Sequence, residues 1–160
     1  MHSIFQVTSE EIQSLSDTHA RELISRLCRA ELRSKGLSEA SVTWGGDQRA
    51  ADGGVDVRVN VTPAVGIDGY IPKSSVVFQV KVETFSVAKI PNEMMPKGEL
   101  RVSIKELASK SGSYVIVSTK DNTSDTSLAK RKNAMLDCLT SNGLAGEVQF
   151  DFYDSGLPPI

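Results

Sequence analysis

The chain has 160 residues, a length that fits one domain with its own hydrophobic core. Its formal charge of −2 at pH 7 argues against a protein that coats nucleic acid nonspecifically, although it allows one local binding patch. No apolar run approaches the roughly 18 residues that span a membrane, and no signal-like segment begins the chain, so we expect no membrane association and a cytoplasmic location. Two cysteines, Cys28 and Cys138, are too few for a disulfide framework or a zinc cluster.

The first elements in chain order are two helices. Thr8 and Glu11 have the spacing of a capping box before a short helix at about 9–15. Asp17 is a candidate cap for a longer helix at about 18–35. Hydrophobic periodicity then predicts strands at about 42–44, 55–61, 75–83, 113–118 and 147–153, and helices at about 99–110 and 126–141.

This order predicts an α/β fold with a mixed central β-sheet flanked by helices. The early strands favour an antiparallel hairpin, and the later alternation of strands with helices favours parallel crossovers. We expect one domain over 1–160, with a core at about 17–153 and a loop around Pro91 and Pro96. The tail from Asp154 looks like the start of a further segment, which suggests the N-terminal part of a longer protein.

Polar side chains share one face of two of these strands. Strict alternation in the strand at 55–61 sends its four valines to one face and Asp56 to the other. In the strand at 75–83, Gln79 and Lys81 alternate with apolar residues. If the two strands pair as a hairpin, Asp56 lies beside Gln79 and Lys81.

These residue types suit a magnesium site. The Asp56 carboxylate, an oxygen of Gln79 and the backbone carbonyl of Val80 are ligands that Mg²⁺ accepts. Lys81 could orient an attacking water or stabilise charge on a phosphate. The alternative is a two-stranded meander with one face in the core and the other in water.

A third acidic residue on the long helix is a candidate for the same site. Glu31 falls within the apolar stripe that includes Leu27 and Cys28, whereas Glu22 lies nearly opposite. Because a buried carboxylate must be paired or bind a metal, we expect Glu31, and not Glu22, to turn toward Asp56. An ion pair with Lys35 is the competing interpretation.

Taken together, these motifs resemble those of a known nuclease family. The helix-borne Glu, the segment Gly53-Gly54-Val55-Asp56 and the segment Phe78-Gln79-Val80-Lys81 are similar to the PD-(D/E)XK restriction-endonuclease-like nucleases, in the Mrr-type branch where Gln replaces the second acid. The resemblance implies Mg²⁺-dependent hydrolysis of DNA, with Mn²⁺ as a second candidate ion. It also implies Asp56 as the main metal ligand, Gln79 in place of the second acid, Lys81 as the catalytic lysine and Glu31 as the helix acid.

Such domains serve in restriction or antiphage defence, so a fused or partner regulatory domain is expected, and a homo-oligomer is left open. Gln48 and Asp52, just before the Asp56 strand, are candidates to touch substrate, with a plain polar turn as the alternative. The run Lys130–Lys132 could contact DNA phosphates, although a solvated helix face is the more usual meaning. The competing function is a module that binds nucleic acid or a protein partner without cutting.

Overall fold

The computed structural model describes residues 8–44, 55–61, 71, 73 and 75–156. Its helices are α1 (Ser9–Gln13), α2 (Asp17–Ser34), α3 (Ile90–Met94), α4 (Val102–Ser109) and α5 (Asp125–Ser141). Its strands are β1 (Val42–Trp44), β2 (Val57–Asn60), β3 (Ser75–Lys81), β4 (Ser113–Ser118) and β5 (Gln149–Tyr153). Short 3-10 turns lie at Glu39–Ser41, Val87–Lys89 and Pro96–Gly98.

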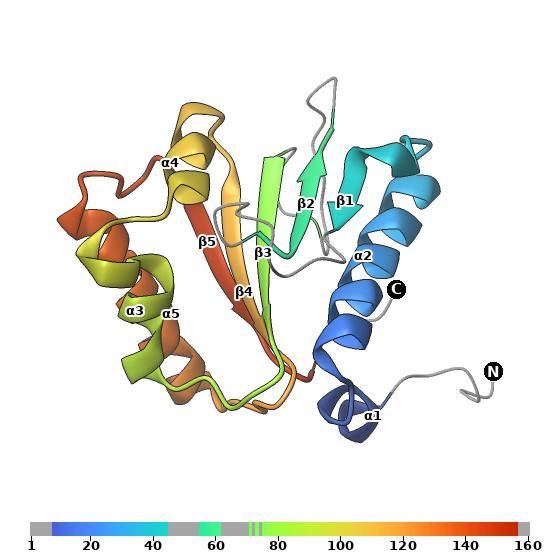
Figure 1. The fold of residues 1–160 in the computed structure, drawn as a ribbon, viewed down its shortest axis with the longest axis horizontal. Helices are drawn as coiled ribbons and strands as arrows, with labels where there is room; N and C mark the ends of the chain where they lie inside the picture. The colour runs from blue at the N-terminus through green and yellow to red at the C-terminus, as the bar shows by residue number, and fades with distance from the viewer. Residues whose placement is uncertain (1–7, 45–54, 62–70, 72, 74, 157–160) are drawn as a thin grey trace.

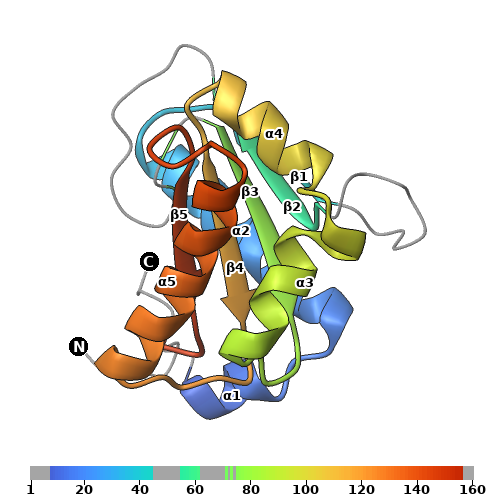
Figure 2. The same cartoon turned by 90° about the vertical axis from the view of Figure 1, so that its left-hand side faces the viewer.

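The strands form one mixed sheet in the order β1-β2-β3-β4-β5. β1 and β2 are antiparallel, as are β2 and β3, whereas β3, β4 and β5 run parallel. α2 covers one face, and α3, α4 and α5 lie on the other (Figures 1 and 2). The predicted α/β fold with a mixed sheet between helices is therefore confirmed.

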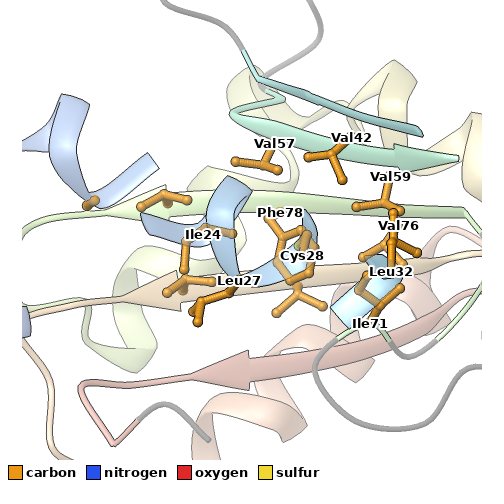
Figure 3. Packing of buried hydrophobic residues seen from close by; sticks show 14 of the residues in the cluster. Ile24, Leu27, Cys28, Leu32, Val42, Val57, Val59, Ile71, Val76 and Phe78 are labelled. Carbon is orange, nitrogen blue, oxygen red and sulfur yellow. The ribbon is translucent and has the colours of Figure 1, made fainter. Parts of the chain in front are cut away.

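The apolar residues form one core on each face of the sheet. On the α2 side, Val57 and Val59 of β2 and Val76, Phe78 and Val80 of β3 pack beneath the helix (Figure 3). The helix contributes Ala20, Ile24, Leu27, Cys28 and Leu32 to the same cluster. Burial of each Val, Leu, Ile or Phe side chain in this cluster contributes about 1.5–3 kcal/mol, and together these side chains hold α2 against the sheet.

α2 begins one residue away from the expected cap. Ser16, and not Asp17, is the N-cap, and its side chain accepts a hydrogen bond from the backbone N–H of His19. Asp17 instead lies in the first turn, where its charge is favourable at the positive end of the helix dipole.

No helix in the described part of the chain is both long and apolar enough to cross a membrane.

Two local features differ from the sequence-based expectations. α3 occupies the segment expected to be a loop, because Pro91 stands in the first turn of a helix, where its missing N–H costs nothing. The strict alternation predicted from Val55 onward also breaks. The chain bends at Asp56, and Val55 joins the core opposite the one that holds Val57.

Candidate active site

Asp56 and Gln79 meet where β2 begins alongside β3. The pairing of Val57 with Phe78 brings Asp56 opposite Gln79. Gln79 Nε2 donates to Asp56 Oδ2 at 3.1 Å, and the backbone N–H of Val80 donates to the same oxygen at 2.7 Å. The structure therefore brings Asp56 and Gln79 together as expected, and Val80 meets Asp56 through its backbone N–H, whereas the sequence had indicated its carbonyl.

The bend at Asp56 explains how its carboxylate reaches this position. The N–H of Asp56 donates to the Phe78 carbonyl at 3.2 Å, next to the last rung between β2 and β3. If β2 continued further toward the N-terminus, the Val80 N–H would donate to its backbone. Here it donates to the Asp56 side chain instead. The carboxylate thus lies just before the first residue of β2, where the charges of Arg21 on α2 and Lys81 on β3 both act on it.

The environment of Asp56 disfavours its charged form. Burial raises the pKa of the Asp56 carboxyl to about 6. The Val80 N–H and the charges of Arg21 and Lys81 oppose that rise, whereas the nearby carboxylate of Asp17 adds to it. A carboxylate that is costly to ionise here gains much from a bound cation.

Lys81 has a carboxylate partner that comes from α3. Its Nζ lies 2.9 Å from Oε2 of Glu93, and Arg101 Nη2 lies 3.1 Å from Oε1 of the same residue. Arg101 Nε also donates to the backbone carbonyl of Glu93 at 2.6 Å. The Lys81 ammonium stands 5.8 Å from the centroid of the Phe85 ring, within cation–π range.

Two buried polar atoms near these groups have no hydrogen-bond partner among the described residues. They are Oε1 of Gln79 and the hydroxyl of Tyr114. Burial raises the pKa of Tyr114, and the charges of Glu93 and Asp56 raise it further, against the influence of Arg101. The hydroxyl therefore lies within the field of this group, which we name the Asp56 cluster: Asp56, Gln79, Lys81, Glu93, Arg101 and Tyr114.

Glu31 does not belong to the Asp56 cluster. Its Oε2 accepts the backbone N–H of Ile71 at 2.7 Å. Asp17 is the α2 acid whose charge reaches Asp56, and Glu31 lies about 21 Å further along the helix at 1.5 Å per residue. Glu22 pairs with Arg26 at 2.7 Å, so the structure assigns neither helix Glu to the site.

Gln48 and Asp52, the candidate substrate contacts, lie outside the described residues. The run Lys130–Lys132 does lie within them. Arg131 is buried, and Lys132 pairs with Asp151 at 3.1 Å, so both side chains have partners within the chain.

The oxygen atoms at the cluster fit a hard divalent cation, although sparsely. Asp56 supplies a carboxylate, and the unpaired Oε1 of Gln79 is an acceptor beside it. Among the residues that the structure describes, no three His, Cys, Asp or Glu side chains gather as a metal-binding group. Mg²⁺ is often held by only one or two carboxylates, with water and substrate phosphates completing its shell. The residues present fit that mode of binding.

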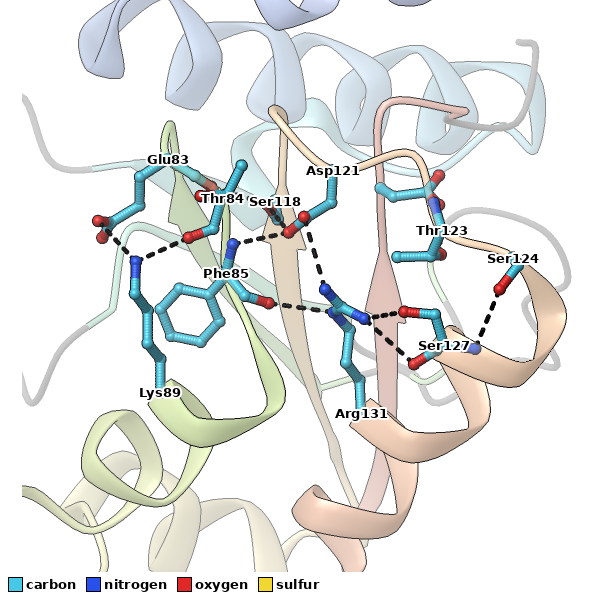
Figure 4. Close-up of polar contacts among 11 residues, drawn as sticks. Glu83, Thr84, Phe85, Lys89, Ser118, Asp121, Thr123, Ser124, Ser127 and Arg131 are labelled. Atoms are coloured by element: carbon cyan, nitrogen blue, oxygen red, sulfur yellow. Dashed lines mark hydrogen bonds and ion pairs between the residues drawn. The ribbon is translucent and has the colours of Figure 1, made fainter.

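Figure 4 shows a second polar cluster, around Asp121 and Arg131. It meets the first cluster through Phe85, whose ring contacts Lys81. Asp121 Oδ2 accepts from the Ser118 hydroxyl at 2.6 Å and from the Phe85 N–H at 2.8 Å, while Oδ1 lies 3.5 Å from Arg131 Nη2. Arg131 Nε donates to the Phe85 carbonyl at 3.0 Å, and Nη1 donates to the carbonyl and hydroxyl of Ser127. We name these five residues the Arg131 network.

Sequence reasoning missed several members of this region. Glu93 was missed because its helix was expected to be a loop. Arg21 is buried on α2 three residues before Ile24 and seven before Cys28, so helical spacing could have flagged it. Arg101 and Tyr114 carry no local signal, since their relation to Glu93 arises only in the folded chain.

The chain was compared with protein-family models, with curated proteins and with solved structures. None of the three comparisons finds a match. The fold and the geometry of the Asp56 cluster are therefore the observations from which a function is inferred.

Proposed function

We propose that the chain is a Mg²⁺-dependent DNA endonuclease domain that hydrolyses phosphodiester bonds. The observation that carries the proposal is the Asp56 carboxylate, which accepts from both Gln79 and the Val80 N–H, with Lys81 two residues beyond Gln79 on the same strand. An acid, an amide and a lysine on two paired strands are the groups that a metal-assisted phosphodiesterase needs.

Each residue has a distinct task in this proposal. Asp56, the side-chain oxygen of Gln79 and the Val80 carbonyl would hold Mg²⁺, with Mn²⁺ as a substitute. The bound ion would supply Lewis-acid stabilisation of the phosphate and a more acidic water. Lys81 would place a positive charge against the scissile phosphate, where negative charge builds up in the transition state. Gln79 also fixes the orientation of the Asp56 carboxylate by donating to Oδ2.

The overall charge of the chain bears on how it would meet DNA. A formal charge of −2 gives little general attraction to phosphates, so we expect weak binding to DNA at physiological salt. A fused or associated regulatory domain would then bring the site to its substrate, as in a restriction or antiphage defence protein.

The second candidate is a module that binds nucleic acid or a protein without cutting. Its support is the ion pair between Lys81 and Glu93 at 2.9 Å, which places a compensating negative charge beside the lysine that a nuclease would use. The sparse set of acids in the described residues favours it as well.

Incubation with supercoiled plasmid separates the two functions. The nuclease proposal predicts nicked and linear DNA with Mg²⁺, intact DNA with EDTA and intact DNA with Asp56→Ala in Mg²⁺. Electrophoretic mobility shifts in EDTA report binding independently of cleavage. Retention of DNA without any Mg²⁺-dependent cutting would favour the binding module, and cutting that survives Asp56→Ala would exclude Asp56 as the metal ligand.

A further inference from the structure

Glu93 is sheltered and holds two cations, one on each carboxylate oxygen. Lys81 approaches Oε2 at 2.9 Å and Arg101 approaches Oε1 at 3.1 Å. The exposed fraction is 11% for the Glu93 side chain, 22% for Lys81 and 20% for Arg101. Ion pairs that are this sheltered are screened by salt far less than surface pairs. The two ion pairs therefore restrict the orientation of all three side chains.

Arg101 fixes the Glu93 carboxylate independently of Lys81. Besides the side-chain contact, Arg101 Nε donates to the Glu93 carbonyl at 2.6 Å. The backbone N–H of Arg101 donates to the Met94 carbonyl at 3.0 Å, which joins the residue to the end of α3. The carboxylate that meets Lys81 is therefore held by the backbone and side chain of another residue.

Lys81 is restrained from a second side by the Phe85 ring at 5.8 Å. The backbone of Phe85 is itself held, since its N–H donates to Asp121 and its carbonyl accepts from Arg131. A free lysine side chain loses rotamer entropy when it is ordered by a ligand. Here an ion pair and a ring contact already restrict the Lys81 side chain.

We propose that Glu93 is a positioning residue for Lys81, and that Arg101 anchors Glu93 in that role. The inference rests on the proposed function, because Lys81 is the group that would stabilise the phosphate in the transition state. Glu93 fixes the direction in which the ammonium points, so the enzyme spends no binding energy on ordering it when DNA arrives. The structural alternative is an ion pair that stabilises α3 against β3 and has no effect on the rate.

The test uses Glu93→Gln, which keeps the shape of the side chain and removes its charge. Glu106→Gln is the matched control, since Glu106 also faces a cation, Arg58, but at 3.9 Å and with a side chain that is 54% exposed. Both proteins are compared with wild type well below their unfolding midpoints. Cleavage is followed with plasmid and Mg²⁺ to obtain kcat and KM separately.

We expect Glu93→Gln to lower kcat by on the order of ten- to a hundredfold without raising KM, the scale of a misplaced catalytic group. Glu106→Gln keeps both values. In the Lys81→Ala background, Glu93→Gln has no further effect on kcat, because its action passes through the lysine. An unchanged kcat in Glu93→Gln, or effects of the two substitutions that multiply, would overturn the inference while leaving the nuclease proposal intact.

A second measurement does not depend on cleavage. NMR order parameters of the Lys81 side chain in the metal-free protein report its rigidity directly. They should fall in Glu93→Gln and stay at the wild-type value in Glu106→Gln; a Lys81 side chain equally mobile in all three proteins would overturn the inference. If Glu93→Gln does not fold, Glu93→Asp keeps the charge, retracts the carboxylate by one methylene and should show the same loss of order. A wild-type protein that never cuts DNA would overturn the nuclease proposal and the role of Glu93 in it.

Discussion

The Asp56 cluster and the Arg131 network meet at Phe85, whose ring contacts Lys81 and whose backbone pairs with Asp121 and Arg131, and they differ in how completely their polar atoms are paired. In the Arg131 network, both oxygens of Asp121 and all the nitrogens of the Arg131 guanidinium meet partners. In the Asp56 cluster, Gln79 Oε1 and the Tyr114 hydroxyl are buried without a partner among the described residues, and Asp56 is costly to ionise.

This difference separates groups that hold the fold from groups that are available to a ligand. A saturated buried network stabilises the chain and leaves nothing for a ligand to bind. A desolvated acid next to buried polar atoms without partners lowers the stability of the fold. Such an arrangement is typical of a functional site, where binding or chemistry maintains it. Four sets of substitutions test that distinction.

Removal of the Arg131 guanidinium should have the largest effect. Arg131→Met leaves Asp121 buried without its cation, and breaking a buried pair in this way costs about 3–5 kcal/mol. The control is Lys132→Met, the next residue, whose partner Asp151 lies in a more exposed pair at 3.1 Å and should cost less than about 1 kcal/mol. Urea denaturation measures both. Equal, small losses would show that the Arg131 network does not hold the fold.

Lys81 and Lys89 contact the same Phe85 ring and make a matched pair for function. Their Nζ atoms lie 5.8 and 5.9 Å from its centroid. Lys81→Ala should lower cleavage by on the order of 10²–10³-fold, the scale for loss of one preorganised electrostatic group. Lys89, which pairs with Glu83 at 3.3 Å, should be replaceable by Ala at near wild-type activity. Circular dichroism checks that both variants fold, and equal activity in the two would exclude a special role for Lys81.

Asp56→Asn should make the metal-free protein more stable in a pH-dependent way. The pKa of Asp56 is raised from 3.8 to about 6 by burial, so the folded chain binds this proton more tightly than the unfolded chain. Wild-type stability therefore falls as pH rises from about 4 to 6, and the lower value persists above pH 6. Asn removes this loss, with a gain on the order of 3 kcal/mol at pH 8 and little at pH 4.

Thermal melts of both proteins in EDTA across this pH range measure the effect. A gain that is the same at pH 4 and pH 8 would mean that ionisation of Asp56 is not its source.

The smallest effects are expected from deleting one hydroxyl in each cluster. Ser118→Ala removes a donor 2.6 Å from Asp121 and should cost about 1.5 kcal/mol. Tyr114→Phe removes a hydroxyl that has no partner among the described residues, and should leave stability unchanged or raise it slightly. Urea denaturation of both variants decides this. A larger loss for Tyr114→Phe than for Ser118→Ala would reverse the contrast between the clusters.

The strands of the site could be predicted because runs rich in valine and other apolar residues are typical of strands. Gln79 and Lys81 stand out among the apolar residues of β3, and Asp56 stands out among the valines just before and within β2, although both faces of β3 are buried and Gln79 is buried with them. Their proximity then followed from a hairpin, and the antiparallel pairing of β2 with β3 is what the structure has. The bend at Asp56 was not predictable, since the valine pattern continues through it.

Helical periodicity failed for Glu31 because it gives the face of a helix and not the position along it. Glu31 is partly buried on α2, as its spacing implied, yet it meets the Ile71 N–H and not Asp56. Glu93 was not predicted at all, for another reason. Two prolines five residues apart resemble a loop, and only the tertiary fold reveals the short helix, with Pro91 in its first turn, that brings Glu93 to Lys81.

The most direct test of the central claim is the cleavage of supercoiled plasmid by wild type and by Asp56→Asn across a series of Mg²⁺ concentrations at pH 8. We predict that the wild-type rate rises with Mg²⁺ to a plateau. The Asn variant, although it melts at a higher temperature than wild type in EDTA, should stay at background throughout. Cleavage at the wild-type rate by a well-folded Asp56→Asn protein would contradict the account. Asp56, whose charged form is disfavoured by burial, would then have no role in the chemistry.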